Sequence, residues 1–157
     1  MTHQIKPVPE GYHTITPHLV VKGASQAIEF YKKAFGAEEL TRLPGPDGKS
    51  IMHAALKIGD SILFLVDAFP EMGCQGPEIG GKSPVTIHLF VEDVDSTFNA
   101  ALAAGAEQSM PVADMFWGDR YGRLVDPFGH HWSLATHKED LTPEEISKRA
   151  QTAFCSQ

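Results

Sequence analysis

The chain has 157 residues, 42% of them hydrophobic and 21% charged, which is enough to bury the core of one domain or of two small halves. Its formal net charge is −7, and an acidic chain of this size argues against a protein that wraps nucleic acid or binds an anionic membrane surface. The sequence contains no apolar run of the roughly 18 residues that a membrane-spanning helix needs.

Residues 1–11 are interpreted as an N-terminal arm, and residues 12–68 as a first folded module. The module contains an amphipathic helix in "SQAIEFYKKAFGAEE", with Ser25 as its predicted N-cap and Gly36 after its last apolar turn. The apolar residues of this helix recur at helical spacing: Ala27, Ile28, Tyr31, Ala34 and Phe35. Strands are predicted near residues 14–22, 39–43, 51–58 and 61–67.

The segment 69–84, "FPEMGCQGPEIGGKSP", collects loop-forming residues and is predicted to be a linker. The second module, residues 85–137, then repeats the first, because "TIHLFVED" corresponds to "TPHLVVKG" and starts 70 residues after it. A helix follows in "DSTFNAALAAGAEQ", with Asp95 as its predicted N-cap. Asp126 in "DPFGH" is interpreted as a turn residue. Strands are predicted near residues 85–92, 107–115, 121–126 and 131–136.

The two copies together predict the fold class. Each copy reads as a strand, a helix and three further strands, so the chain is expected to be an α+β protein made of two βαβββ modules. Residues 138–157 form a C-terminal tail with a short helix, in which Thr142, Pro143 and Glu145 give a capping box with proline at the first helical position. This helix is interpreted either as a dimer arm or as a solvated tail.

These motifs resemble those of the vicinal oxygen chelate superfamily, which includes glyoxalase I, fosfomycin-resistance proteins, bleomycin-resistance proteins and extradiol dioxygenases. The resemblance is carried by "HLVVKGASQAIEFYKKAFGAEE" in the first copy and by "LFVEDVDSTFNAALAAGAE" and "GRLVDPFGHHWSL" in the second. The passage "FWGDRYGRLVDPFGHHW" is similar to the PhnB-like branch. The resemblance implies curved mixed sheets, each with its helix on the outer face, that enclose a pocket.

The resemblance also implies where a metal ion would be held. Metal-using members take ligands from the first and last strands of each module. Those positions correspond here to Thr16, Phe64, Thr86 and Ser133. Divalent metals prefer imidazole, carboxylate or thiolate ligands, and a phenylalanine ring offers no donor atom. No metal site of the glyoxalase type and no cofactor are therefore predicted.

Four histidines are predicted to face the implied pocket, because side chains two apart on a strand share a face. His18 and His88 share a face with the threonines at the first-strand positions, and apolar alternation directs His53 and His131 inward as well. The sequence leaves three interpretations open: pocket-wall residues, acid–base groups with His18 and His88 as the catalytic candidates, or a displaced site for a divalent metal.

The stretch "MFWGDRYGR" also has two interpretations. As a pocket lip, it would let Trp117 stack on a ligand while Arg120 or Arg123 contacts an anionic or carbonyl group. As a structural element, it would let Asp119 and Arg120 pair to fix a hairpin, while Phe116 and Trp117 pack in the core.

The residues expected to bind a ligand are His18, His53, Phe64, His88, Trp117, Asp119, Arg120, Arg123 and His131. The aromatic side chains favour a metal-free protein that binds a small organic molecule, as the bleomycin-resistance members do. The alternative is an enzyme of the lyase, isomerase or dioxygenase type that uses pocket histidines with or without a divalent metal.

The remaining expectations concern partners and location. The resemblance and the open sheet edges predict a homodimer, with a small-molecule ligand and with neither nucleic acid nor membrane as a partner. Cys74 and Cys155 form no CxxC pair, and the N-terminus has neither the basic nor the apolar region of a signal peptide. Free thiols and a cytoplasmic location are therefore expected.

Overall fold

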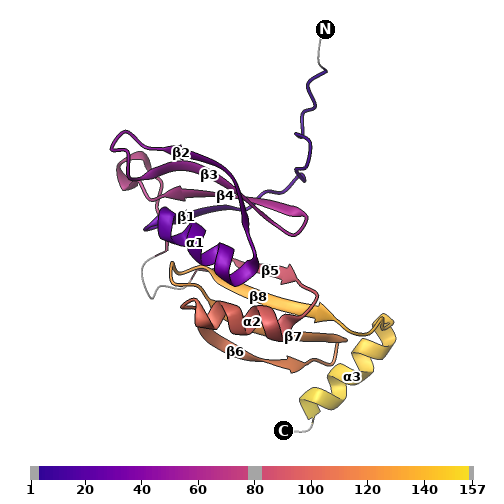
Figure 1. The fold of residues 1–157 in the computed structure, drawn as a ribbon. Coiled ribbons are helices and arrows are strands. Elements are labelled where there is room, and N and C mark those ends of the chain that lie inside the picture. Colours follow the sequence, from indigo (N-terminus) through magenta and orange to yellow (C-terminus); the bar gives the residue numbers. More distant parts are fainter. Residues whose placement is uncertain (1–3, 78–82, 156–157) are drawn as a thin grey trace. The chain divides into compact units, whose positions relative to one another are not determined.

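The computed structural model describes residues 4–77 and 83–155. It divides the chain into two compact units, Met1–Gly81 and Lys82–Gln157. Each unit is described by itself, and the division falls inside the segment 69–84 that the sequence suggests is a linker. Each unit contains one four-stranded sheet (Figure 1). In the described part of the chain, no helix is long and apolar enough to cross a membrane.

The first unit runs from an N-terminal strand through one helix into three further strands. The elements in chain order are β1 (His18–Val21), α1 (Ala24–Phe35), β2 (Glu38–Pro44), β3 (Ile51–Ile58), β4 (Ser61–Asp67) and the short 3-10 helix η1 (Pro70–Met72). The strands lie in the order β1-β4-β3-β2. β1 pairs in parallel with β4, whereas the other pairs are antiparallel.

The second unit repeats this topology. The elements in chain order are β5 (Thr86–Phe90), α2 (Val94–Ala103), β6 (Glu107–Asp114), β7 (Asp119–Val125), β8 (His131–His137) and α3 (Pro143–Cys155). The strands lie in the order β5-β8-β7-β6, and β5 pairs in parallel with β8. The α+β fold with two βαβββ repeats that the sequence predicts is confirmed.

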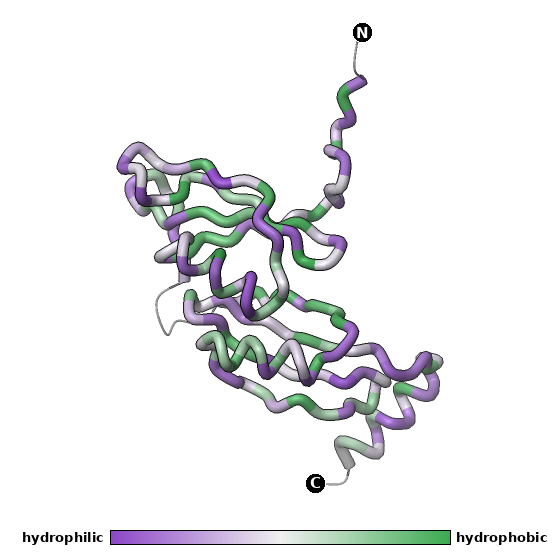
Figure 2. The backbone as a smooth tube through the Cα atoms, in the orientation of Figure 1, coloured by the Kyte–Doolittle hydropathy of each residue, from purple (hydrophilic) through white to green (hydrophobic). Residues whose placement is uncertain are grey.

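Each sheet buries the face that its helix covers. In the first unit, Leu19, Val21 and Leu65 of the sheet and Ile28 and Tyr31 of α1 are all at most 5% exposed. In the second unit, the buried residues of the sheet include Leu124, Trp132 and Leu134, and Phe98 of α2 is 2% exposed. Figure 2 shows hydrophobic stretches on strands of both units and on α2, with hydrophilic residues between them. The alternation of buried and open side chains follows from the two-residue period of a strand.

Gly122 on β7 lets α2 approach its sheet closely. A Cβ atom at this position would lie 3.0 Å from the Phe98 ring and 2.8 Å from a methyl group of Val112. The glycine therefore gives Phe98 the space to lie on the strand. The side of the sheet that α2 covers carries Gly122, Leu124, Trp132 and Leu134, and we call the opposite side the helix-free face.

The first turn of each helix is held by a side chain from the last strand of its own sheet. In the first unit, the Asp67 carboxylate accepts hydrogen bonds from the backbone N–H groups of Gly23 (3.1 Å), Ala24 (2.8 Å) and Ile51 (2.7 Å). In the second unit, the Thr136 hydroxyl accepts from the N–H of Val94 at 2.8 Å. Because helix N-termini leave backbone donors unpaired, these residues provide the acceptors that the termini need.

The predicted N-caps are wrong by two residues. The N-cap of α1 is Gly23, whose backbone is left-handed and which makes no side-chain cap, so Ser25 lies inside the helix. The N-cap of α2 is Asp93, which accepts from the N–H of Ser96. The sequence signal misleads because Asp67, far away along the chain, replaces the local cap of α1. The predicted glycine at the end of α1, Gly36, is confirmed.

The turn before β8 is built around Asp126, as predicted. Its carboxylate accepts from the backbone N–H groups of Phe128 (2.9 Å) and His130 (3.0 Å), which fixes the turn. The second oxygen accepts from the indole N–H of Trp132 at 2.8 Å. Asp126 is only 4% exposed, so these three donors supply the hydrogen bonds that a buried carboxylate needs.

The C-terminal helix α3 begins at the predicted capping box. The Thr142 hydroxyl accepts from the N–H of Glu145, and the Glu145 carboxylate accepts from the N–H of Thr142. Arg149 of α3 donates two hydrogen bonds to the carboxylate of Glu139 in the preceding segment. The helix therefore has defined contacts with the segment before it. Whether it serves as a dimer arm stays a prediction.

The Asp67 network yields a test of stability. Replacing Asp67 with Ala removes the acceptor of three backbone donors and should lower the free energy of unfolding by about 2 to 3 kcal/mol. Chemical denaturation monitored by circular dichroism measures this change. The matched control is Asp60→Ala, because within residues 4–77 and 83–155 the exposed Asp60 carboxylate accepts only from the neighbouring Ser61 hydroxyl. Equal losses in both variants would refute the assigned role of Asp67.

Candidate functional site

The helix-free face of the second sheet carries a row of aromatic rings. Starting at β5, Phe90 contacts His88 edge-on with ring centroids 4.5 Å apart, and His88 stacks on Tyr121 of β7 at 6.0 Å. Tyr121 meets Trp117 edge-on at 5.4 Å. We call Phe90, His88, Tyr121 and Trp117 the aromatic row. The central strand β8 separates His88 from Tyr121, and it places the small buried Ala135 opposite both Phe90 and Tyr121.

His88 is held in place by Ser133. The two residues are direct partners in the parallel pairing of β5 with β8, and the His88 Nδ1 atom lies 2.7 Å from the Ser133 hydroxyl oxygen. Ser133 is 3% exposed, so its hydroxyl provides a fixed hydrogen-bonding partner. The His88 residue itself is exposed, but its ring is packed against neighbours on this face. This partial burial lowers the pKa of His88, and the carboxylate of Asp119 opposes the shift.

Arg123 extends across the same face from β7. It lies opposite Ser133 in the antiparallel pairing of β7 with β8, and its guanidinium donates a hydrogen bond of 3.2 Å to the hydroxyl of Thr86. Thr86 lies two residues before His88 on β5 and therefore on the same face. The face thus offers a guanidinium, two hydroxyls and an imidazole next to a row of rings.

Asp119 anchors the far end of the aromatic row. Its carboxylate accepts from the Trp117 indole N–H at 3.2 Å, and its other oxygen lies 2.7 Å from His137 Nδ1. The second ring nitrogen of His137 lies 2.7 Å from Asp140. Hydrogen bonds to Asp140 and Asp119 raise the pKa of His137. Asp119 therefore positions Trp117.

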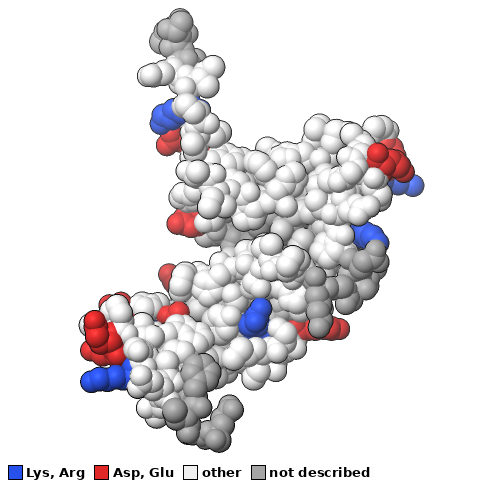
Figure 3. Space-filling view, turned by 180° about the vertical axis from the view of Figure 1, so that it is seen from behind, with Lys and Arg blue, Asp and Glu red and all other residues white. Residues whose placement is uncertain are grey.

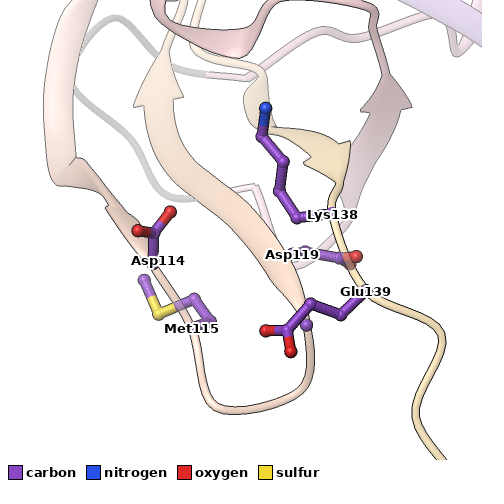
Figure 4. Close-up of a pocket in the computed structure, with 6 residues that line it drawn as sticks. Asp114, Met115, Asp119, Lys138 and Glu139 are labelled. Carbon is purple, nitrogen blue, oxygen red and sulfur yellow. The ribbon is translucent and has the colours of Figure 1, made fainter.

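A pocket of about 300 Å³ lies behind this anchor, at the end of the β6–β7 hairpin. Figure 4 shows Asp114 and Met115 on one side of the hairpin and Lys138 and Glu139 on the strand end beside it. Gly118 closes the hairpin where the backbone of Glu139 crosses it, since a Cβ atom there would lie 2.7 Å from the Glu139 carbonyl oxygen. The pocket has mixed charge, and Asp119 lines it, whereas none of the four rings of the aromatic row does.

Arg120 lies on the opposite side of the sheet from Arg123. Its guanidinium forms two hydrogen bonds with Asp95 in the first turn of α2, at 2.7 and 2.9 Å, and one with Asp114 at 3.2 Å. The predicted pairing of Asp119 with Arg120 is wrong, because adjacent strand residues point to opposite faces. Arg120 instead attaches α2 to the sheet, and Asp119 serves the helix-free face.

The first unit carries a second aromatic cluster on its own sheet. The Phe64 ring contacts His53 at 4.7 Å, Tyr12 at 5.9 Å and His18 at 6.0 Å. His18 and Phe64 are direct partners in the parallel pairing of β1 with β4. The structure therefore brings together three predicted site residues, His18, His53 and Phe64. That this cluster and the aromatic row line a common pocket stays a prediction.

His131 lies on the helix-free face of the second sheet, as the direct partner of Thr86. Its Nε2 atom is buried and has no hydrogen-bond partner among the described residues. The candidates His88, Trp117, Arg123 and His131 therefore all belong to this face. Sequence reasoning did not include Phe90, Tyr121 or Ser133 among the ligand-binding residues. Strand parity would have found Phe90, because it lies two residues after His88 on the same strand.

The model of the Glyoxalase/Bleomycin resistance protein/Dioxygenase superfamily matches residues 11–134, which span both repeats. The chain belongs to this superfamily. The uncharacterized protein Mb0911c of Mycobacterium bovis is 50% identical over 147 residues, which cover 91% of this chain and 93% of that protein.

Solved structures agree with this superfamily assignment. The crystal structure of TioX from Micromonospora sp. ML1 matches with a TM-score of 0.64 and 28% identity over 80% of this chain and 98% of that one. A PhnB protein from Bacillus cereus matches with a TM-score of 0.63 and 19% identity over 79% of this chain and 99% of that one, which shows the shared fold alone. The chain therefore shares its fold with a PhnB protein.

The superfamily's metal positions do not fit a metal ion in this chain. The Ser133 hydroxyl is engaged by His88, the Thr86 hydroxyl accepts from the cationic Arg123, and the Phe64 ring has no donor atom. The Arg123 guanidinium beside Thr86 would repel a divalent cation. Among the described residues of either unit, no three His, Cys, Asp or Glu side chains group as metal ligands would.

The electrostatics of His88 give a second prediction. Its NMR titration midpoint should lie below 6.5, and Asp119→Asn should lower it further, because the Asp119 carboxylate favours the protonated ring. Since the pKa of His88 in the folded state is below the unfolded value, its contribution to stability is present above pH 6.5 and decreases as the pH falls. The exposed Asp140→Asn provides a control that should leave His88 unchanged. A midpoint above 6.5 would contradict the assignment.

Proposed function

We propose that this protein binds a small organic molecule on the helix-free face of its second unit without a metal ion. The observation that carries this proposal is the aromatic row, in which four rings lie beside the hydroxyls of Ser133 and Thr86 and the guanidinium of Arg123. Binding sites for small molecules combine apolar and aromatic surface with a few fixed polar groups. This face has that composition.

The sparse charge on the back of the second unit supports the proposal. In Figure 1, α2 lies in front of the second sheet, and the view from behind in Figure 3 shows this unit as largely white, with one blue group near its middle and the other charged atoms toward its margins. An aromatic surface with few charges favours planar apolar compounds, because ring stacking there replaces contact with water. The donor chemistry at the superfamily's metal positions is consistent with binding that needs no metal.

A second candidate function is proton transfer by His88 in a lyase, isomerase or dioxygenase-type enzyme. One observation favours it: the lowered pKa leaves the imidazole neutral near pH 7, so it can accept a proton, while Ser133 fixes the ring. Ser133 would act as a positioning residue and His88 as the base. Homodimer formation and a cytoplasmic location stay predictions.

Ligand screening tests the binding proposal. Planar aromatic compounds that bind the wild type should raise its melting temperature, and Tyr121→Ala should abolish most of that rise because it interrupts the aromatic row. The control is His13→Ala, which removes an exposed ring of the first unit. Ligands whose effect survives Tyr121→Ala and also Phe90→Ala bind elsewhere, and that result would refute the proposed site.

Incubation of each bound compound with the protein, followed by mass spectrometry, tests the second candidate. A proton-transfer enzyme should convert a bound compound or exchange one of its carbon-bound hydrogens for solvent deuterium. At compound concentrations that saturate both proteins, the His88→Gln variant should lose at least about a hundredfold of this rate. Conversion that continues unchanged in His88→Gln would exclude His88 as the base.

A further inference from the structure

Arg123 differs from the other arginines of the chain in having no counter-ion among the described residues. The chain contains four arginines. Arg42 pairs with Glu39, Arg120 with Asp95 and Asp114, and Arg149 with Glu139. In the described part of the chain, the hydrogen-bond partner of the Arg123 guanidinium is the neutral hydroxyl of Thr86. A half-buried guanidinium without a carboxylate partner can pair with an anionic group of a ligand.

The internal repeat shows that the fold does not require this charge. In the second unit, the row of direct strand partners reads His88, Ser133 and Arg123. The same row in the first unit reads His18, Phe64 and Ala55. Ala55 is 2% exposed and supports the same topology with a single methyl group. The shared topology therefore does not require Arg123, which lies in the unit that also carries the aromatic row.

The groups around Arg123 are arranged to receive a negative charge. A guanidinium has five N–H donors in a planar fork that matches the two oxygens of a carboxylate. One of these donors is given to Thr86, whose own hydroxyl hydrogen can be donated to the same ligand. Because the pKa of His88 is lowered, the imidazole adds no second positive charge near pH 7. A single positive charge matches a monoanion better than a doubly charged phosphate.

We propose that the ligand of this face is a planar aromatic carboxylate, with its carboxylate on Arg123 and Thr86 and its ring on His88 and Tyr121. This inference rests on the proposed function and narrows it to one chemical class. The rings of His88 and Tyr121 lie nearly parallel, with an interplanar angle of 21°, and they flank the strand from which Ser133 faces Arg123. The ring and the carboxylate of one small ligand can therefore be bound together.

Two probes that differ only in charge test this inference. 2-Naphthoate and its neutral isostere 2-naphthamide are titrated into the wild type by isothermal calorimetry at low salt. Naphthoate should bind tenfold to a hundredfold more tightly, which is the range expected for charge-assisted hydrogen bonds. Arg123→Gln should abolish this preference, so that naphthoate and naphthamide bind the variant with affinities within about twofold of each other. Arg123→Lys should retain part of the preference, because it keeps the charge without the planar fork.

The matched control is Arg42→Gln, which removes an exposed arginine of the first unit and should leave the naphthoate preference intact. Circular dichroism spectra establish that each variant is folded. The inference is overturned if naphthoate and naphthamide bind wild type equally, if Arg42→Gln and Arg123→Gln act alike, or if neither probe binds at millimolar concentration. If the inference fails in one of these ways, the proposed function is still supported when neutral aromatic compounds bind the wild type and fail to bind Tyr121→Ala. A screen without any Tyr121-dependent ligand would refute the proposed function itself.

Discussion

The parallel pairing of the first strand with the last strand in each unit is the constraint on which the rest of the structure depends. It joins β1 to β4 and β5 to β8, and it fixes which side chains become neighbours across the sheet. Because side chains alternate with a period of two, a shift of one residue would move His88 from the helix-free face to the face beneath α2. The register that buries Trp132 and Leu134 under the helix therefore also places His88 beside Ser133.

The same scaffold is used twice, with different chemistry on its two helix-free faces. Where the first unit has Phe64 and Ala55, the second has Ser133 and Arg123, so one face is aromatic and the other combines rings with polar groups. The contacts that hold the first turn of the helix also differ between the two units. Asp67 holds the start of α1 through three backbone donors, whereas Thr136 holds the start of α2, and Arg120 adds an ion pair to the first turn of α2. The two copies thus carry different side chains at corresponding positions of the same topology.

Much of the architecture was predictable because its signals are local. Periodicity and short turn motifs predict the helices, the strands and the capping box at Thr142. The sequence repeat at a spacing of 70 residues predicts that these elements form two similar modules. Strand parity also placed His88 and His131 on one face. The predicted N-caps failed because a residue distant in sequence, Asp67, supplies the acceptor for the first turn of α1. The expected pairing of Asp119 with Arg120 failed because neighbours on a strand point in opposite directions.

The sequence by itself determined the fold and the superfamily, since each depends on residue identity and on spacing along the chain. Only the tertiary structure decided which polar groups are already engaged. Arg120 and Arg123 are three residues apart and chemically identical, yet among the described residues one is held by Asp95 and Asp114 and the other has only the Thr86 hydroxyl. The physical reason is that the distance between charges in space determines the strength of their interaction, and strand pairing sets that distance.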